Sequence, residues 1–101
     1  MSAIRIDHAP AESRLNEIGV KAWPPGRCEI SEFPWTYDSR ETWYLLEGEV
    51  IVTPVGGGPG TIAAGDLVVF PAGMSCRWNV LHAVRERNRF PSAAEITEHG
   101  R

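Results

Sequence analysis

The sequence predicts an all-β fold, most simply a small antiparallel β-barrel. Short apolar or alternating segments recur from residue 28 onward, and turns that contain glycine or proline separate them. Many short strands with turn signals every 8–12 residues or so are typical of a barrel or a sandwich. The 101 residues have the length of one domain, so we expect a single domain over residues 1–101.

The expected elements follow from these patterns in chain order. Residues 4–6 are expected to form a short edge strand, and residues 11–15 hold the one plausible helical turn. Residues 28–33 alternate apolar and polar side chains, which indicates a half-buried strand. The other expected strands are residues 41–46, 50–55, 61–64, 67–70 and 75–84.

Two polar or glycine-rich stretches have ordinary structural interpretations. Residues 54–60 contain three consecutive glycines, but the stretch joins two strands and includes two prolines, so we expect a hairpin connection and not a phosphate-binding loop. The basic stretch Arg85–Arg89 is expected to be a solvated strand end, with an anion or a partner subunit as the alternative contact. We expect the barrel core to end at about residue 90 and residues 91–101 to form a flexible tail.

Composition excludes several classes of partner. A net charge of −3 does not favour nucleic acid or an anionic membrane. The longest apolar run, Leu67–Met74, is far shorter than the ~20 residues that cross a bilayer, and the first residues lack the apolar core of a signal peptide. We therefore expect a soluble, cytoplasmic protein in which Cys28 and Cys76 are reduced thiols.

The most informative segment is Gly65–Cys76. It contains a glycine, five residues, Pro71-Ala-Gly73, two residues and then Cys76. This spacing resembles the second motif of the cupin family, which places a histidine at the position of Cys76. Glu41 and Gly48 have the spacing with which the first cupin motif ends.

Further matches resemble one branch of that family, the small cupins grouped with the cupin domain of (S)-ureidoglycine aminohydrolase. The matching segments are Phe33-Pro-Trp35-Thr-Tyr37, Glu41, Leu46–Val50, Gly65–Met74 and Cys76-Arg-Trp78. The resemblance covers residues 23–90, the expected barrel core. It implies an RmlC-like jelly roll, also called a double-stranded β-helix, and by analogy a homodimer.

The resemblance also implies a site at the mouth of the barrel. Because residues two apart in a strand share a face, the implied lining is Trp35, Tyr37, Glu41, Trp43, Cys76 and Trp78. Among indole rings Glu41 is suited to act as a general acid or base, with Tyr37 as a hydrogen-bond donor or proton relay. Cys76 becomes a nucleophile only beside a base or a cation, and is otherwise a small buried side chain.

A typical cupin binds a divalent metal through three histidines and a carboxylate. Here Trp35, Tyr37 and Cys76 stand at the histidine positions, so we expect no cofactor, with an unusual metal site of Glu41, Tyr37 and Cys76 as the alternative.

The first hypothesis for function is therefore binding of a small molecule, a polar nitrogen-containing or carboxylate metabolite, with catalysis left open. The alternatives are a metal-dependent cupin and a non-catalytic barrel whose interior is filled by side chains.

Overall fold

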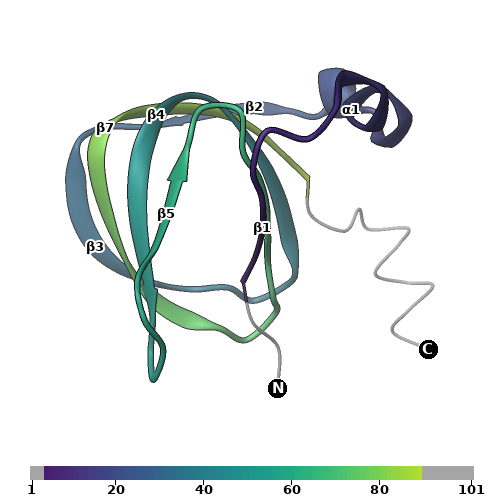
Figure 1. Cartoon of the computed structure of the whole chain (residues 1–101). Helices are drawn as coiled ribbons and strands as arrows, with labels where there is room; N and C mark the ends of the chain where they lie inside the picture. Colours follow the sequence, from purple (N-terminus) through teal and green to yellow (C-terminus); the bar gives the residue numbers. More distant parts are fainter. Residues whose placement is uncertain (1–3, 90–101) are drawn as a thin grey trace, which may run out of the picture.

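The computed structural model describes residues 4–89, which form a curled antiparallel sheet with one helix outside it (Figure 1). The strands are β1 (Arg5–Asp7), β2 (Pro25–Cys28), β3 (Ser31–Thr36), β4 (Glu41–Pro54), β5 (Gly60–Ala63), β6 (Leu67–Phe70) and β7 (Ser75–Arg89). The helix α1 (Glu12–Ile18) is followed by a 3₁₀ turn, Val20–Ala22.

The two long strands β4 and β7 pair with each other and form the centre of the sheet. Strands β5 and β6 pair with β4, β1 pairs with β6, and β2 and β3 pair with β7, all antiparallel. Within residues 4–89 no pairing joins β1 to β2, so the sheet curls into a barrel shape without closing. The observed architecture confirms the predicted all-β fold of the cupin jelly-roll type.

Both central strands bend sharply at the same level. The expected strands 41–46 and 50–55 are one continuous strand, β4, and its register against β7 shifts between Leu45 and Val50. Gly48 lies in this bend with φ +101°, and a Cβ there would overlap the carbonyl oxygen of Ala83. Only glycine fits such a position without strain, because it has no Cβ to clash.

Two expected strand boundaries are wrong. Residues 28–33 are divided between β2 and β3, because β2 pairs with the second half of β7 and β3 with the first half. The strand expected over 75–84 continues to residue 89. The expected tail, residues 91–101, lies outside the described residues.

The helical segment covers the outer face of the sheet. Gly19 ends α1 in the left-handed conformation, with φ +75° and its N–H bonded to the Asn16 carbonyl, which is a common helix C-terminus. Beyond it, Val20 and Trp23 pack with Leu15 and Leu67 in a small apolar cluster. The expected helical turn at 11–15 is confirmed in a longer form, and no helix among residues 4–89 has the length and hydropathy to cross a membrane.

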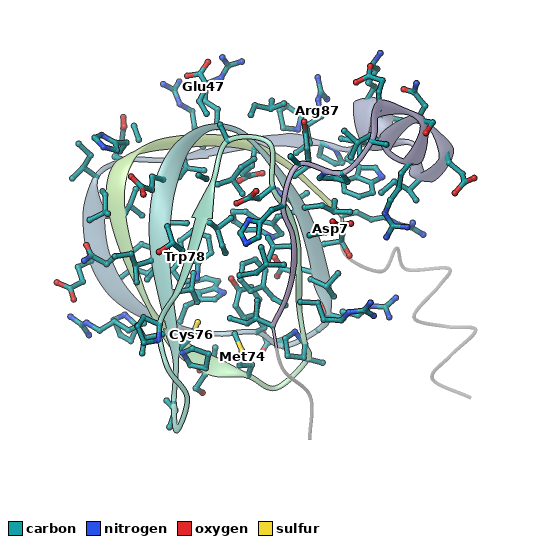
Figure 2. All side chains as sticks on the ribbon, viewed as in Figure 1. Asp7, Glu47, Met74, Cys76, Trp78 and Arg87 are labelled. Carbon is teal, nitrogen blue, oxygen red and sulfur yellow. The ribbon has the colours of Figure 1, made fainter. Side chains whose placement is uncertain are left out.

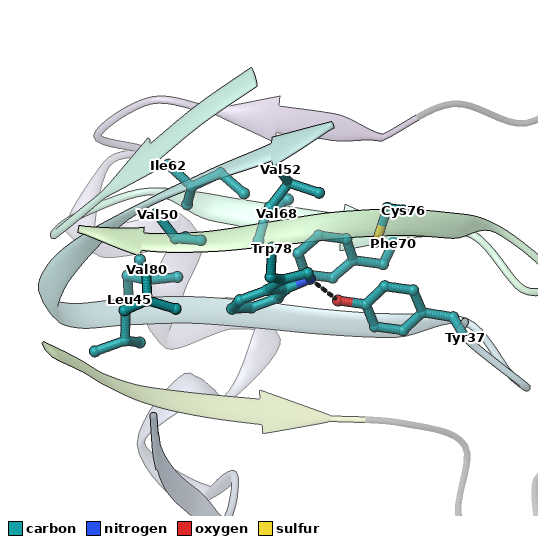
Figure 3. Close-up of a cluster of buried hydrophobic side chains, with 11 residues drawn as sticks. Tyr37, Leu45, Val50, Val52, Ile62, Val68, Phe70, Cys76, Trp78 and Val80 are labelled. Carbon is teal, nitrogen blue, oxygen red and sulfur yellow. Dashed lines mark hydrogen bonds between the residues drawn. The ribbon is translucent and has the colours of Figure 1, made fainter. Parts of the chain in front are cut away.

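The main core lies inside the barrel (Figure 3). Aliphatic side chains such as Val50, Ile62 and Val80 fill one part, and the aromatic rings of Tyr37, Phe70 and Trp78 fill the other. The interior therefore has an aliphatic part that is packed full and an aromatic part that carries polar atoms.

Candidate ligand-binding site

A pocket of about 200 Å³ opens in the aromatic part of the interior. Its lining combines five aromatic rings with one carboxyl group, one thiol and one guanidinium. The residues are Arg27, Cys28, Phe33, Trp35, Tyr37, Glu41, Trp43 and Trp78. Every residue that the sequence predicted for this lining is present except Cys76.

A larger hollow of about 720 Å³ lies where β1, the loop 55–59 and the turn 71–74 meet. Its lining is aliphatic side chains, glycine, proline, Met74 and Ser75. None of the described residues that line it has a titratable side chain, so it offers no group for acid–base chemistry or charge recognition. The smaller aromatic pocket is therefore the candidate site.

Tyr37 and Trp78 form the buried wall of the pocket. Trp78 Nε1 donates a hydrogen bond to Tyr37 Oη over 3.0 Å, the dashed line in Figure 3. The Tyr37 ring stacks on Phe70 with ring centroids 4.6 Å apart, and only 1% of Tyr37 is exposed. Burial raises the pKa of Tyr37 far above its usual range, and neighbouring Cys76 adds to the rise. The phenol is therefore neutral and keeps its proton to donate.

Glu41 stands at the start of β4, where its side chain is half-buried. Trp43, two residues on and thus on the same face, donates its indole N–H to Glu41 Oε1 over 2.8 Å. The Trp43 ring in turn packs against Trp78, with centroids 5.1 Å apart. Because a carboxylate accepts up to about four hydrogen bonds, one indole donor leaves Glu41 with capacity to bind a ligand.

Cys76 is buried behind the aromatic wall and does not line the pocket. It is 4% exposed and pairs in register with Trp35 of β3. Burial raises the pKa of the Cys76 thiol, and a hydrogen bond with Trp78 lowers it by a smaller amount. The thiol is therefore neutral and has the surroundings of a small buried side chain. The catalytic role expected for Glu41, Tyr37 and Cys76 stays a prediction.

The pocket also contains residues that the sequence prediction missed. Phe33 stacks on Trp78 with centroids 5.9 Å apart and meets the half-exposed Trp35 edge-on. Phe33 lies two residues before Trp35 in the same strand, and this spacing could have predicted that both side chains share a face. Arg27 and Cys28 lie on β2, and no sequence pattern connected that strand with the pocket.

A second carboxyl group, Glu86, lies in the interior. It is 3% exposed, so the expectation of a solvated strand end over Arg85–Arg89 is wrong at this position. The alternation of β7 turns Glu86 inward, where Asn88 Nδ2 donates to Glu86 Oε1 over 2.7 Å and Gly26 of β2 leaves room for the carboxyl group. Burial raises the pKa of Glu86, and the nearby Glu41 raises it further.

The residues at the cupin metal positions do not fit a divalent cation. Burial raises the pKa values of Tyr37 and Cys76, so a cation would have to displace a proton from each, and Trp35 has no lone pair to offer. Among residues 4–89 no three His, Cys, Asp or Glu side chains come together in a way that could hold a metal ion. No metal-dependent step is therefore derived for this pocket.

Comparisons with known proteins agree with the fold, which is that of a cupin domain. A family model described as the EutQ-like cupin domain matches residues 15–87. The chain therefore belongs to the EutQ-like cupin domain family. No curated protein matches it.

Several solved structures are similar to the chain. A DUF861 family protein from Thermotoga maritima is 44% identical, with a TM-score of 0.84 over 87% of this chain and 99% of that protein. A candidate ethanolamine utilization protein Q from Salmonella typhimurium is 29% identical, with a TM-score of 0.59 over 65% of this chain and 53% of that one. The EutQ protein of Clostridium difficile shares the fold at 20% identity and a TM-score of 0.59, over 65% of this chain and 52% of that one. The chain thus spans about half the length of each of these two proteins.

Proposed function

We propose that the aromatic pocket binds a small organic cation whose charged nitrogen meets Glu41. The observation that supports this is a half-buried carboxyl group beside the indole rings of Trp35, Trp43 and Trp78. The faces of aromatic rings attract cations, and the carboxylate adds a charge-assisted hydrogen bond. A mostly apolar pocket with few polar groups is also the usual composition of a ligand site.

Each lining group has a role in this proposal. Glu41 accepts the hydrogen bond of the charged nitrogen, and the neutral Tyr37 offers its hydroxyl to an oxygen of the ligand. The exposed Arg27 takes the carboxylate of any ligand that has one. The same site thus suits a nitrogen-containing metabolite with or without a carboxyl group.

Similar proteins suggest the first compounds to test. One of them is named for ethanolamine utilization, and ethanolamine is a small monocation at neutral pH. The resemblance to the cupin domain of (S)-ureidoglycine aminohydrolase suggests nitrogen-containing metabolites as well. The homodimer and the cytoplasmic location expected from the sequence stay predictions.

The test is a titration of the whole chain with ethanolamine, choline and guanidinium, followed by tryptophan fluorescence and by thermal shift. We expect at least one cation to change both signals, whereas the neutral analogue ethylene glycol changes neither. In Glu41→Gln the same cation should bind about 10–100-fold more weakly, the loss of one charge-assisted hydrogen bond.

The matched control is Glu47→Gln, because Glu47 is an exposed β4 glutamate that pairs with Arg85 away from the pocket. This variant should bind the cation as the wild type does. Failure of every cation to bind, or an equal loss of affinity in both variants, would contradict the proposal.

A further inference from the structure

Glu86 is an interior carboxyl group that the proposed ligand contacts leave unused. Figure 2 shows Trp78 of β7 inside the barrel, whereas Arg87 of the same strand lies outside it. Glu86 lies further along this strand, paired in register with Leu45 of β4, and no salt bridge among residues 4–89 involves it.

The groups around Glu86 come from β7, β2 and β4. On β7, Asn88 donates to Oε1, and on β2, a Cβ at Gly26 would lie 2.5 Å from Glu86 Oε2. The inward group two residues further on β2 is the thiol of Cys28. On β4, the charge of Glu41 raises the pKa of Glu86. Glu86 in turn raises the pKa of the Tyr37 phenol.

We propose that Glu86 is a proton-holding residue of the barrel interior, whose charge is coupled to the binding of a cation at Glu41 in the pocket. The inference rests on the proposed function for its ligand. Glu86 pairs in register with Leu45, which shares the inner face of β4 with Glu41. Two negative carboxylates in one small interior repel each other, so the proton stays on Glu86, the more deeply buried of the two. A cation beside Glu41 cancels this repulsion and makes it easier for Glu86 to release the proton.

The coupling has a definite direction. Binding of the cation favours ionised Glu86, and by linkage ionised Glu86 favours binding of the cation. Affinity for a monocation should therefore rise with pH as Glu86 loses its proton, and binding should release protons in that range. Glu86 thus affects the ligand through its charge and does not itself touch the ligand.

The first experiment needs no ligand. In protein labelled with ¹³C at the glutamate carboxyl carbons, NMR follows the titration of Glu86, whose signal is assigned by its absence in Glu86→Gln. We expect a midpoint above the usual glutamate range, and a lower midpoint in Glu41→Gln. A Glu86 midpoint that is ordinary, or that does not respond to Glu41→Gln, overturns the coupling whatever the pocket binds.

The second experiment measures binding of ethanolamine by calorimetry in buffers of different ionisation heat, at pH values where ethanolamine stays protonated. In the wild type we expect proton release, and an affinity that increases about fivefold or more across the Glu86 titration, at the low end of known couplings. In Glu86→Gln, which stays uncharged, both should vanish while binding persists. Equal proton release in the two proteins overturns the proposal. If ethanolamine fails to bind at any pH, that result counts against the cation pocket, and the carboxyl titration still decides the coupling.

Discussion

Two buried carboxyl groups of this barrel have opposite surroundings. Asp66 is 7% exposed and lies in the turn between β5 and β6. Its Oδ2 accepts the N–H of Ala63 over 2.9 Å, and its Oδ1 lies 3.0 Å from Nδ1 of His8. Each oxygen thus has a donor, and the carboxylate holds the turn and the N-terminal segment together.

Glu86 is just as buried, but it has an amide as hydrogen-bond partner and a second carboxyl group within electrostatic range. Both oxygens of Asp66 have a partner close by, whereas the carboxyl group of Glu86 has a second acid near it, which raises its pKa. A buried carboxyl group with donors on both oxygens is explained by structure, whereas one placed near another carboxyl group is a candidate for function. The comparison therefore separates a structural acid from a functional one inside the same small barrel.

The largest expected effect tests the structural acid. Asp66→Ala removes the acceptor of the Ala63 N–H, which costs about 1–3 kcal/mol, and the contact with His8 adds up to ~1 kcal/mol. We expect a total loss of about 1–4 kcal/mol in the free energy of unfolding, measured with urea. His8→Ala isolates the smaller part, since His8 is largely exposed. A loss near zero in Asp66→Ala would mean that Asp66 has no structural advantage over Glu86.

The next effect tests how tightly Glu86 is enclosed. Gly26→Ala places a methyl group 2.5 Å from Glu86 Oε2, so the end of this buried side chain has to shift, and we expect a cost of about 1 kcal/mol, the low end for overpacking. Shortening Glu86 to alanine in the same protein should remove most of that cost, which a double-mutant cycle measures.

The control for this pair is Gly58→Ala. Gly58 lies in the loop 55–59 with no atom within 4 Å of an added Cβ, so we expect little change in stability. If Gly26→Ala and Gly58→Ala behave alike, the carboxyl group does not occupy the space beside β2.

The turn at Asp66 is easier to predict from the sequence than the inward position of Glu86. The pair Gly65-Asp66 between two apolar runs indicates a tight turn, and the structure has a turn there between β5 and β6. Glu86 lies in a run of alternating charged residues, which by composition belongs to a solvated strand end. Period-two alternation from Cys76 through Trp78 in fact continues inward at Val84 and Glu86, across a bend at residues 81–83. Composition and periodicity disagreed here, and periodicity was right.

The same contrast applies to the pocket lining. The resemblance to cupins, together with alternation along two neighbouring segments, predicted Trp35, Tyr37, Glu41 and Trp43 for the lining, and all four line the pocket. The place of Cys76 behind the wall and of Arg27 in the lining depends on which strands pair with β7 and where that strand bends. Such long-range pairing has no local signal in the chain.

The smallest expected effect concerns the charge of Glu86 in the protein without ligand. The pKa of Glu86 is raised in the folded state, so the folded protein binds this proton more tightly than the unfolded chain does. Between the unfolded and the folded pKa, stability should therefore fall as pH rises. Glu86→Gln has no such proton and should lose less stability than the wild type over that interval.

Urea unfolding at a series of pH values measures this difference, with Glu47→Gln as the exposed control that pairs with Arg85. Above the usual glutamate range, we expect the free energy of unfolding of Glu86→Gln minus that of the wild type to increase with pH and then level off. The gap for Glu47→Gln should not show this rise, because that side chain is exposed on the outside of the barrel. A gap for Glu86→Gln that stays constant with pH would mean that folding does not raise the pKa of Glu86. In that case Glu86 would be a second structural acid like Asp66, and the difference between the two buried carboxyl groups would disappear.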